Sequence, residues 1–290
     1  MTLVELKAVI PPGDAEAIDE QIQESGLTGW NILEDVIAHT AGISGVFESE
    51  AAAREAWTQL AAVCPLLATV QMQWRALEER EWRDSYKAHF KAWQFGPLHW
   101  VPVWERETFQ LPSGHEVLWL DPGLAFGTGN HETTRLCVER LVEWSQTADK
   151  SVAILDAGCG SGILALSAAK LGFTRVAGFD NDPEAVRVSE ENAELNGLAG
   201  CVEFCEGDLI SGLEGRQADL VMANILGHVL VAFAPQLVAS VAPGGTLVLS
   251  GILAQENPEV CAAFHNCAPD WVIEHRILGE WSDVQLKRPV

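Results

Sequence analysis

Residues 154–162 carry an acid and three glycines at every second position, in the order Ile-Leu-Asp-Ala-Gly-Cys-Gly-Ser-Gly. The apolar start predicts a buried strand, and residues 163–171 predict a helix directly after the glycines. A strand that turns on glycines into a helix leaves room for a ligand at the helix N-terminus. The dinucleotide fingerprint would need glycine at position 163, which is isoleucine, and the carboxylate of Asp156 would repel a pyrophosphate. The turn favours a ligand without phosphates, but neighbouring residues must decide whether it binds one.

Two polar residues stand at the ends of later strands. Residues 175–180 end in Asp180, at the spacing from Gly158 where such folds bind the ribose hydroxyls of a cofactor. A cap for the following helix is the alternative role of Asp180. Residues 218–224 end in Asn224, which we expect at the carboxyl edge of the sheet, where ligands collect. Its side-chain oxygen and backbone carbonyl are able to orient an amine, whereas ordinary turn formation is the alternative.

The segment 120–134 places three glycines and a proline in a loop before a helix that begins at Thr133 and Thr134. Such a loop is suited to close over a bound cofactor, although glycine-rich loops are also mobile without a function. His131 and Glu132 resemble the start of a zinc-binding helix, but the second histidine of that motif would stand at position 135, which is arginine. No other set of side chains has ligand spacing, so we predict no metal.

The charge of the chain restricts its partners. It has 41 acidic and 18 basic residues and a net charge of -23. Such a charge repels the phosphates of naked nucleic acid and attracts basic partners, or serves only to keep the chain soluble. The seven cysteines form no C-x-x-C pair, which is typical of a reducing compartment. The N-terminus lacks signal-peptide features and no apolar run reaches transmembrane length, so we expect a cytoplasmic protein without membrane contact.

The elements that must position these residues form two domains. Residues 1–75 alternate in the order strand, helix, strand, strand, helix, strand, which predicts a small ferredoxin-like α+β domain. This domain has eleven acidic and three basic residues and no polar cluster suited to catalysis. We interpret it as a recognition or docking module, and a purely structural role is the alternative. Residues 76–93 mix charges and aromatics and predict a connecting helix.

The second domain, residues 94–290, predicts an α/β fold. Strands near 99–104 and 116–120 precede an alternation of apolar strands and helices after residue 150, which is typical of a parallel, doubly wound sheet. The last two strands, near 271–278 and 281–287, have no helix between them. They predict a closing antiparallel hairpin.

Three segments resemble a known family, namely 120–134, 154–162 and the sequence Ala-Asn-Ile-Leu at 223–226. They are similar to the class I S-adenosylmethionine-dependent methyltransferases, and within them to the bacterial ribosomal protein methyltransferases of the PrmA type. The resemblance spans nearly the whole chain. It implies a Rossmann-like class I sheet and S-adenosylmethionine as the cofactor. It also implies methylation of lysine side chains and the N-terminal amine of protein eleven of the large ribosomal subunit, a basic partner held by the N-terminal domain.

Carried over from this resemblance, the cofactor contacts fall on Thr134, Gly158, Asp180 and Asn224. The expected mechanism is direct displacement at the sulfonium methyl by a neutral amine, oriented by Asn224, with no residue identified as a general base. Three alternatives stay open. The first is a methyltransferase acting on another protein or on RNA, the second is a dinucleotide-dependent oxidoreductase, and the third is a cofactor-binding module without chemistry.

Overall fold

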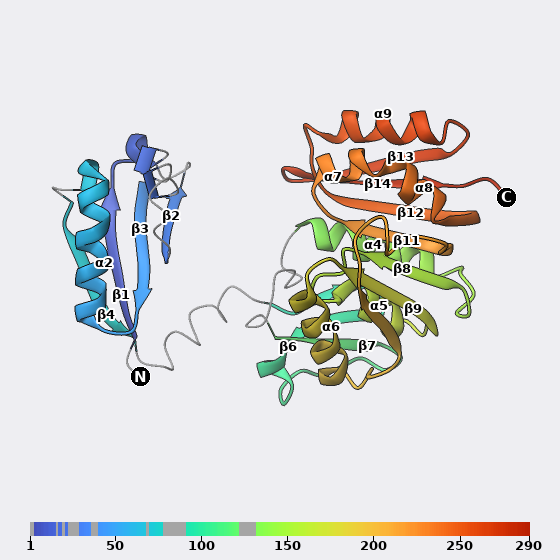
Figure 1. Ribbon diagram of the computed structural model, residues 1–290. Helices are drawn as coiled ribbons and strands as arrows, with labels where there is room; N and C mark the ends of the chain where they lie inside the picture. Colours follow the sequence, from blue (N-terminus) through green and yellow to red (C-terminus); the bar gives the residue numbers. More distant parts are fainter. Residues whose placement is uncertain are drawn as a thin grey trace. The chain divides into compact units, whose positions relative to one another are not determined.

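The protein folds into two compact units, Met1–His89 and Phe90–Val290 (Figure 1). The computed structural model describes residues 3–15, 17–18, 21–22, 29–35, 40–67, 70–77, 91–121 and 132–290. Each unit has a hydrophobic core of its own.

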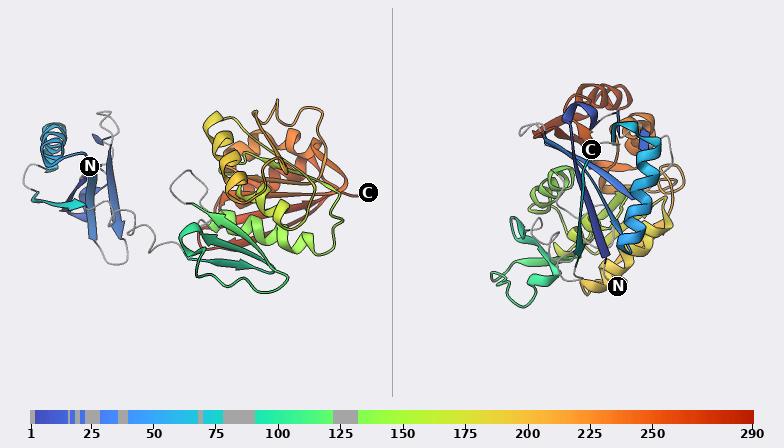
Figure 2. Two further views of the ribbon diagram at one scale, coloured as in Figure 1. Left: turned by 90° about the horizontal axis from the view of Figure 1, so that it is seen from below. Right: turned by 90° about the vertical axis from the view of Figure 1, so that its left-hand side faces the viewer.

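The first unit is a four-stranded antiparallel sheet in the order β2-β3-β1-β4. Residues 15, 17, 18, 21 and 22 are helical between the first two strands, and helix α2 lies along one face of the sheet (Figures 1 and 2). This order and topology confirm the predicted ferredoxin-like fold. The elements are β1 (Leu3–Ile10), η1 (Pro12–Asp14), β2 (Trp30–Asp35), β3 (Thr40–Phe47), α2 (Glu50–Val63), η2 (Pro65–Leu67) and β4 (Met72–Leu77).

The alternation along β1 explains the core of this unit. Every second side chain from Val4 to Ile10 is buried, and α2 covers them with Trp57 and Leu60. Side chains on alternate positions of a strand share one face, so the sequence pattern fixes which face meets the helices. Ser49 caps α2, because its side chain accepts a 3.1 Å hydrogen bond from the backbone N–H of Ala52.

The predicted connecting helix over 76–93 is wrong at both ends. Ala76 and Leu77 belong to β4, where they pair with Val4 and Leu3 of β1. At the other end, Trp93 begins β5 and pairs with Trp100. Pairing with β1 at one end and with the nearby strand β6 at the other overrides the local helix preference at these positions. Residues 78–90, the middle of the predicted helix, lie outside the described residues.

The second unit contains a seven-stranded sheet in the order β10-β9-β8-β11-β12-β14-β13. Its first five strands are parallel and doubly wound around β8. The hairpin at the end folds back so that β14, the later strand, pairs antiparallel with both β12 and β13. The predicted Rossmann-like sheet with an antiparallel hairpin is confirmed. The strands are β8 (Ala153–Ala157), β9 (Arg175–Asp180), β10 (Val202–Glu206), β11 (Ala218–Asn224), β12 (Val241–Leu253), β13 (Val272–Leu278) and β14 (Trp281–Lys287).

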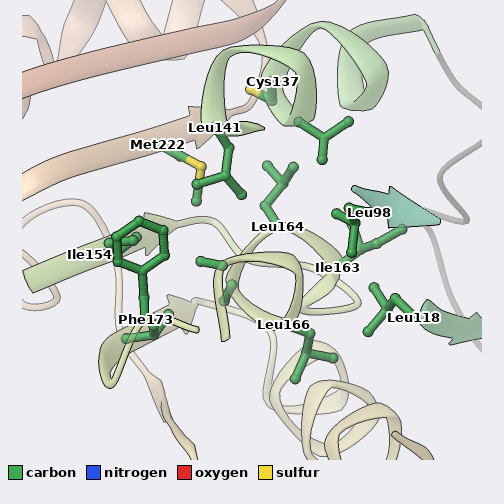
Figure 3. Packing of buried hydrophobic residues seen from close by; sticks show 14 of the residues in the cluster. Leu98, Leu118, Cys137, Leu141, Ile154, Ile163, Leu164, Leu166, Phe173 and Met222 are labelled. Atoms are coloured by element: carbon green, nitrogen blue, oxygen red, sulfur yellow. The ribbon is translucent and has the colours of Figure 1, made fainter. Parts of the chain in front are cut away.

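Helices cover both faces of this sheet. Figure 3 shows Leu141 of α4 and Leu164 of α5 in one core with Met222 of β11, while Phe264 of α9 belongs to the core on the opposite face. The burial of whole strands, such as Leu220 to Ala223, follows from coverage on both sides. The helices are α4 (Glu132–Ser145), α5 (Ile163–Lys170), α6 (Pro183–Leu195), α7 (Gly227–Ala232), α8 (Ala234–Ala239) and α9 (Asn257–Cys267).

A separate three-stranded sheet, β5-β6-β7, packs against α5. The indole N–H of buried Trp100 donates a 2.9 Å hydrogen bond to Ser167 of α5. Asn196 at the end of α6 accepts from the backbone N–H of Trp119 at 2.7 Å and donates to its carbonyl at 3.0 Å. These contacts fix the point where the chain enters the glycine-rich loop. The elements are β5 (Trp93–Phe95), β6 (Leu98–Pro102), η3 (Val103–Glu105) and β7 (Glu116–Leu120).

Candidate functional site

The glycine turn after β8 needs its glycines for two reasons. Gly158 and Gly162 have φ values of 73° and 75°, in the left-handed region that favours glycine. A Cβ on Gly158 would lie 2.7 Å from Cγ2 of Ile225, and one on Gly162 would lie 2.8 Å from the ring of Phe204. Any larger residue would therefore strain the backbone and collide with a neighbour. The turn lies at the carboxyl ends of β8 and β11, next to the point where the sheet reverses its winding.

Asp180 supports this turn directly. Its Oδ2 accepts a 2.9 Å hydrogen bond from the backbone N–H of Gly160, and its Oδ1 accepts one of 3.1 Å from Asp182. The alternative role of Asp180 as a helix cap is wrong, because Asp182 is the N-cap of α6 and accepts from Glu184. Each carboxylate oxygen retains the capacity to accept a second bond, as a ribose contact requires. That contact stays a prediction.

Asp156 lies beneath the turn and is 1% exposed. Its Oδ2 accepts a 3.1 Å hydrogen bond from the backbone N–H of Ala165, whereas its Oδ1 has no hydrogen-bond partner in the described part of the chain. Burial, together with a smaller effect of the nearby Asp180 carboxylate, raises the pKa of Asp156 from 3.8 to about 7. An unsatisfied buried acid next to a ligand turn suits a cationic ligand and opposes a phosphate. This agrees with S-adenosylmethionine, which carries a sulfonium and an ammonium group.

The structure brings Asn224 and Thr134 together. Asn224 is the last residue of β11, and its Nδ2 donates a 3.3 Å hydrogen bond to Oγ1 of Thr134 in the first turn of α4. Ile225, the next residue, is the one that approaches Gly158. Three of the predicted cofactor contacts thus lie around one point, where β8, β11 and α4 meet. Asp180 joins them through its bond to the same glycine turn.

Two site residues on α6 were missed by the sequence argument. The hydroxyl of Ser189 is shared between the carbonyl of Gly160 at 3.0 Å and that of Ala185 at 2.9 Å. The side chain of Asn192 donates a 2.9 Å hydrogen bond to the carbonyl of Ser161. These bonds hold the turn from its outer side. The sequence offers one indication of them, because two polar residues three positions apart share one face of a helix.

Residues 122–131, including His131 and most of the glycine-rich loop, lie outside the described residues. Within the part of the chain that the structure describes, no group of three or more His, Cys, Asp or Glu side chains is arranged to hold a metal ion. Among the same residues, no helix is both long and apolar enough to cross a membrane.

Comparison with known proteins decides the family. The model of the family "Ribosomal protein L11 methyltransferase (PrmA)" matches residues 12–289. The chain belongs to this family. The ribosomal protein L11 methyltransferase from Pelotomaculum thermopropionicum is 35% identical to this chain, and the match covers 97% of each protein. A second, from Pelobacter propionicus, is 44% identical over 77% of this chain and 70% of its own.

A solved PrmA structure agrees with this assignment. The ribosomal protein L11 methylase from Lactobacillus delbrueckii subsp. bulgaricus is 31% identical, with a TM-score of 0.61, and covers 69% of this chain and 100% of its own. Membership of a methyltransferase family with this fold makes S-adenosylmethionine the methyl donor and decides against a dinucleotide-dependent oxidoreductase. The glycine turn and the unsatisfied acid beneath it fit this cofactor.

Proposed function

We propose that the protein transfers methyl groups from S-adenosylmethionine to amino groups, lysine side chains and the N-terminal amine, of ribosomal protein L11. One observation carries the proposal, namely the hydrogen bond from Asn224 to Thr134 beside the glycine turn. It places an amide at the carboxyl edge of the sheet, where ligands of α/β folds bind. The printed names of the relatives support the choice of L11 as the acceptor.

The residues that would hold the cofactor come from the elements meeting at this edge. The backbone of the turn at Gly158 would contact it, Asp180 would accept from the ribose hydroxyls, and Thr134 and Asn224 would line the opposite side. When bound, S-adenosylmethionine supplies an electrophilic methyl group on a cationic sulfur. The main task of the site would therefore be to align an amine with this methyl group, and not to generate a strong nucleophile.

Asn224 is the residue that we assign to this alignment. Its Nδ2 is committed to Thr134, so the amide is held in one orientation and its Oδ1 is the group left to accept from the substrate. An acceptor oxygen and a neighbouring backbone carbonyl bind the N–H groups of a neutral amine and direct its lone pair. A lysine has an ordinary pKa of about 10.4, so the amine must lose a proton before it attacks. We assign no general base to this step.

The N-terminal unit is proposed to dock the substrate. Residues 1–75 of this unit have eleven acidic and three basic residues, a charge that complements a basic ribosomal protein. A purely structural role for this unit is the competing explanation. A different acceptor, another protein or an RNA, is the competing function, and the net charge of -23 counts against RNA.

Transfer of a radiolabelled methyl group tests the proposal. The full-length enzyme is incubated with labelled S-adenosylmethionine and either purified L11, the other large-subunit proteins or ribosomal RNA. We expect label in L11, and on its lysines and N-terminal amine after digestion. A reaction without enzyme serves as the control for background label, and the Asn224→Ala variant should label L11 much more slowly than the wild type. Label in RNA or in another protein, with none in L11, would replace the proposed acceptor.

A further inference from the structure

Ser250 stands out because it is a fully buried hydroxyl in an apolar strand. It is 0% exposed and follows Leu247, Val248 and Leu249 of β12, which are equally buried. Burying a hydroxyl among apolar side chains is costly unless the hydroxyl is hydrogen-bonded. The partner of this hydroxyl is therefore informative about why a serine stands here.

The partner lies at the beginning of α4. The Ser250 hydroxyl donates a 2.9 Å hydrogen bond to the backbone carbonyl of Thr133, the residue before Thr134. Helix α4 packs on both β11 and β12 (Figure 1). One buried side chain thus fixes the first turn of the helix that supplies Thr134.

The backbone of Ser250 fixes the other half of the site. Ser250 pairs with Asn224 in the register of β11 and β12, and its carbonyl accepts a 3.2 Å hydrogen bond from the backbone N–H of Ile225. The following glycine, Gly251, has a φ of 82°, and a Cβ on it would lie 2.3 Å from the carbonyl oxygen of Ile225. The end of β12 is therefore tightly seated against the segment that follows Asn224.

We infer that Ser250 is a positioning residue of the methyl-transfer site, which holds the Thr134 hydroxyl and the Asn224 amide within hydrogen-bonding distance. It bonds to the residue before Thr134 and to the residue after Asn224, and it acts through both. Its own side chain points at the helix backbone and not at a reacting group. Misplacement of aligned groups by about 1 Å costs roughly 100-fold in rate, so loss of this contact matters for transfer although Ser250 touches no substrate.

The chain provides a matched control at the other end of the same strand. Ser240 directly precedes β12, is 1% exposed, and donates a 2.8 Å hydrogen bond to the carbonyl of Leu237. Ser240→Ala and Ser250→Ala each remove one buried hydroxyl bonded to a backbone carbonyl. The two variants differ in position, because Ser250 pairs with Asn224 at the cofactor site whereas Ser240 lies at the opposite end of β12.

The test compares these variants in the full-length enzyme by three measurements: the melting temperature, the dissociation constant of S-adenosylmethionine by calorimetry, and kcat and KM with L11. We expect similar losses of melting temperature in both. For Ser250→Ala alone we expect kcat to fall roughly 10-fold and the dissociation constant to rise about threefold, with KM for L11 within about twofold. Wild-type kcat and cofactor affinity in Ser250→Ala, or equal losses in Ser240→Ala, would overturn the inference.

A double-mutant cycle separates positioning from general stability. Ser250→Ala removes only the hydroxyl, which bonds to the helix turn that holds Thr134, and keeps the backbone bond to Ile225. It should therefore add little to the loss already caused by Thr134→Val, both in kcat and in cofactor affinity. Fully additive effects would show that Ser250 does not act through this pair. If Ser250→Ala melts below the assay temperature, Ser250→Cys, of similar size and with a weak donor, takes its place in the same comparison.

The inference rests on the proposed function, but the two fail in different ways. Absence of L11 methylation by the wild-type enzyme would reject the proposed acceptor. The cofactor titration would still test Ser250 in that case, because Thr134 and Asn224 are both predicted to contact S-adenosylmethionine.

Discussion

The side-chain amide of Asn224 donates a 3.3 Å hydrogen bond to the hydroxyl of Thr134, a residue ninety positions earlier in the chain. One group ends a central strand and the other begins a helix, so the bond joins two elements that only the folded sheet brings together. We predict that it also selects which end of the Asn224 amide meets the substrate. In that case the reaction depends on how α4 packs on the end of β11.

Replacing Asn224 by alanine should lower kcat for L11 methylation by roughly 100-fold, because an aligning acceptor is lost from the site. Thr134→Val should lower it by about 10-fold, since the amide remains but loses the partner that orients it. Asn257→Ala is a suitable control. Asn257 on α9 is buried, and its side-chain amide likewise donates to a hydroxyl, that of Ser282 on β14, at 3.1 Å. Steady-state kinetics that show the same loss in the control would assign the effect to general destabilisation.

Asp180→Ala should weaken the binding of S-adenosylmethionine by roughly 1.5 to 3 kcal/mol, the range for hydrogen bonds to a charged group. The loss has two sources, because the ribose contact disappears and Gly160 loses its carboxylate acceptor. Calorimetric titration measures it. Asp182→Ala, two residues further, removes the N-cap of α6 instead and should cost about 1 kcal/mol of stability with unchanged cofactor affinity. Unchanged affinity in Asp180→Ala would show that the ribose lies elsewhere.

Asp156 should make the stability of the cofactor-free protein depend on pH. Burial raises its pKa from 3.8 to about 7. Between these values the folded protein holds a proton that the unfolded chain has released, so the free energy of unfolding should fall as the pH rises from about 4 to 7, by on the order of a few kcal/mol. Asp156→Asn should remove this component. Denaturant titrations across the pH range measure it.

The same group should affect cofactor binding in the opposite direction. As the pH rises from about 6 to 8, Asp156 ionises and a cationic ligand should bind more tightly. Asp156→Asn should flatten this dependence. Asp219→Asn is the control, because Asp219 also accepts a backbone N–H, that of Ala153 at 2.8 Å, but at the amino end of β8. A pH profile of cofactor affinity that is identical in wild type and Asp156→Asn would contradict the assignment.

The sequence predicts the sheet of the second unit well, because its signals are local. The strand at 175–180 has the predicted bounds, since its run of apolar residues and glycine at 176–179 ends at an acid. The glycine turn is equally readable, because only glycine fits its backbone at 158 and 162. The sequence predicts the closing hairpin but not that β14 lies between β12 and β13 in the sheet. Strand order depends on which edge of the sheet remains open after folding, which a local pattern does not show.

The rest of the site could not be read in this way. The spacing of Ser189 and Asn192 predicts that they share one face of α6, but no local pattern says that this face meets the glycine turn. Ser250 looks like a polar interruption of an apolar strand until its partner on α4 is known. The short strand Trp93–Phe95 has no strong strand preference in its own residues. It forms because it pairs with β6, which a local pattern does not show.

The hairpin is tied to α4 by a buried ion pair whose loss should be costly. Arg140 donates to both carboxylate oxygens of Asp283 on β14, at 2.8 and 2.9 Å, and both residues are almost fully buried. Arg140→Met leaves an uncompensated buried charge and should lower the free energy of unfolding by about 3 to 5 kcal/mol. Arg187→Met breaks exposed pairs with Glu184 and Glu191 on α6 and should cost less than about 1 kcal/mol. Equal costs in urea denaturation would mean that burial does not set the strength of the pair.

The N-terminal unit should be required for methylation of L11 but not for cofactor binding. A chain that begins at Phe90 keeps the whole second unit, whereas a cut after residue 75 would leave the last two residues of β4 behind. We expect this shortened protein to bind S-adenosylmethionine with wild-type affinity and to lose L11 methylation. Calorimetry and the radiolabel assay measure the two properties, and full activity of the shortened protein would refute the docking role.

A charge reversal tests the same role in the intact chain. Glu48 and Glu55 are exposed on the N-terminal unit, and Glu259 and Asp270 are exposed on the second unit. Lysine at the first pair should raise KM for L11 roughly tenfold at low salt, with little change in kcat, because it weakens attraction to a basic partner. Lysine at the second pair changes the net charge equally and should have a much smaller effect. If both pairs raise KM alike, the attraction belongs to the overall charge of the protein and not to its N-terminal unit, and raising the salt concentration should then abolish both effects together.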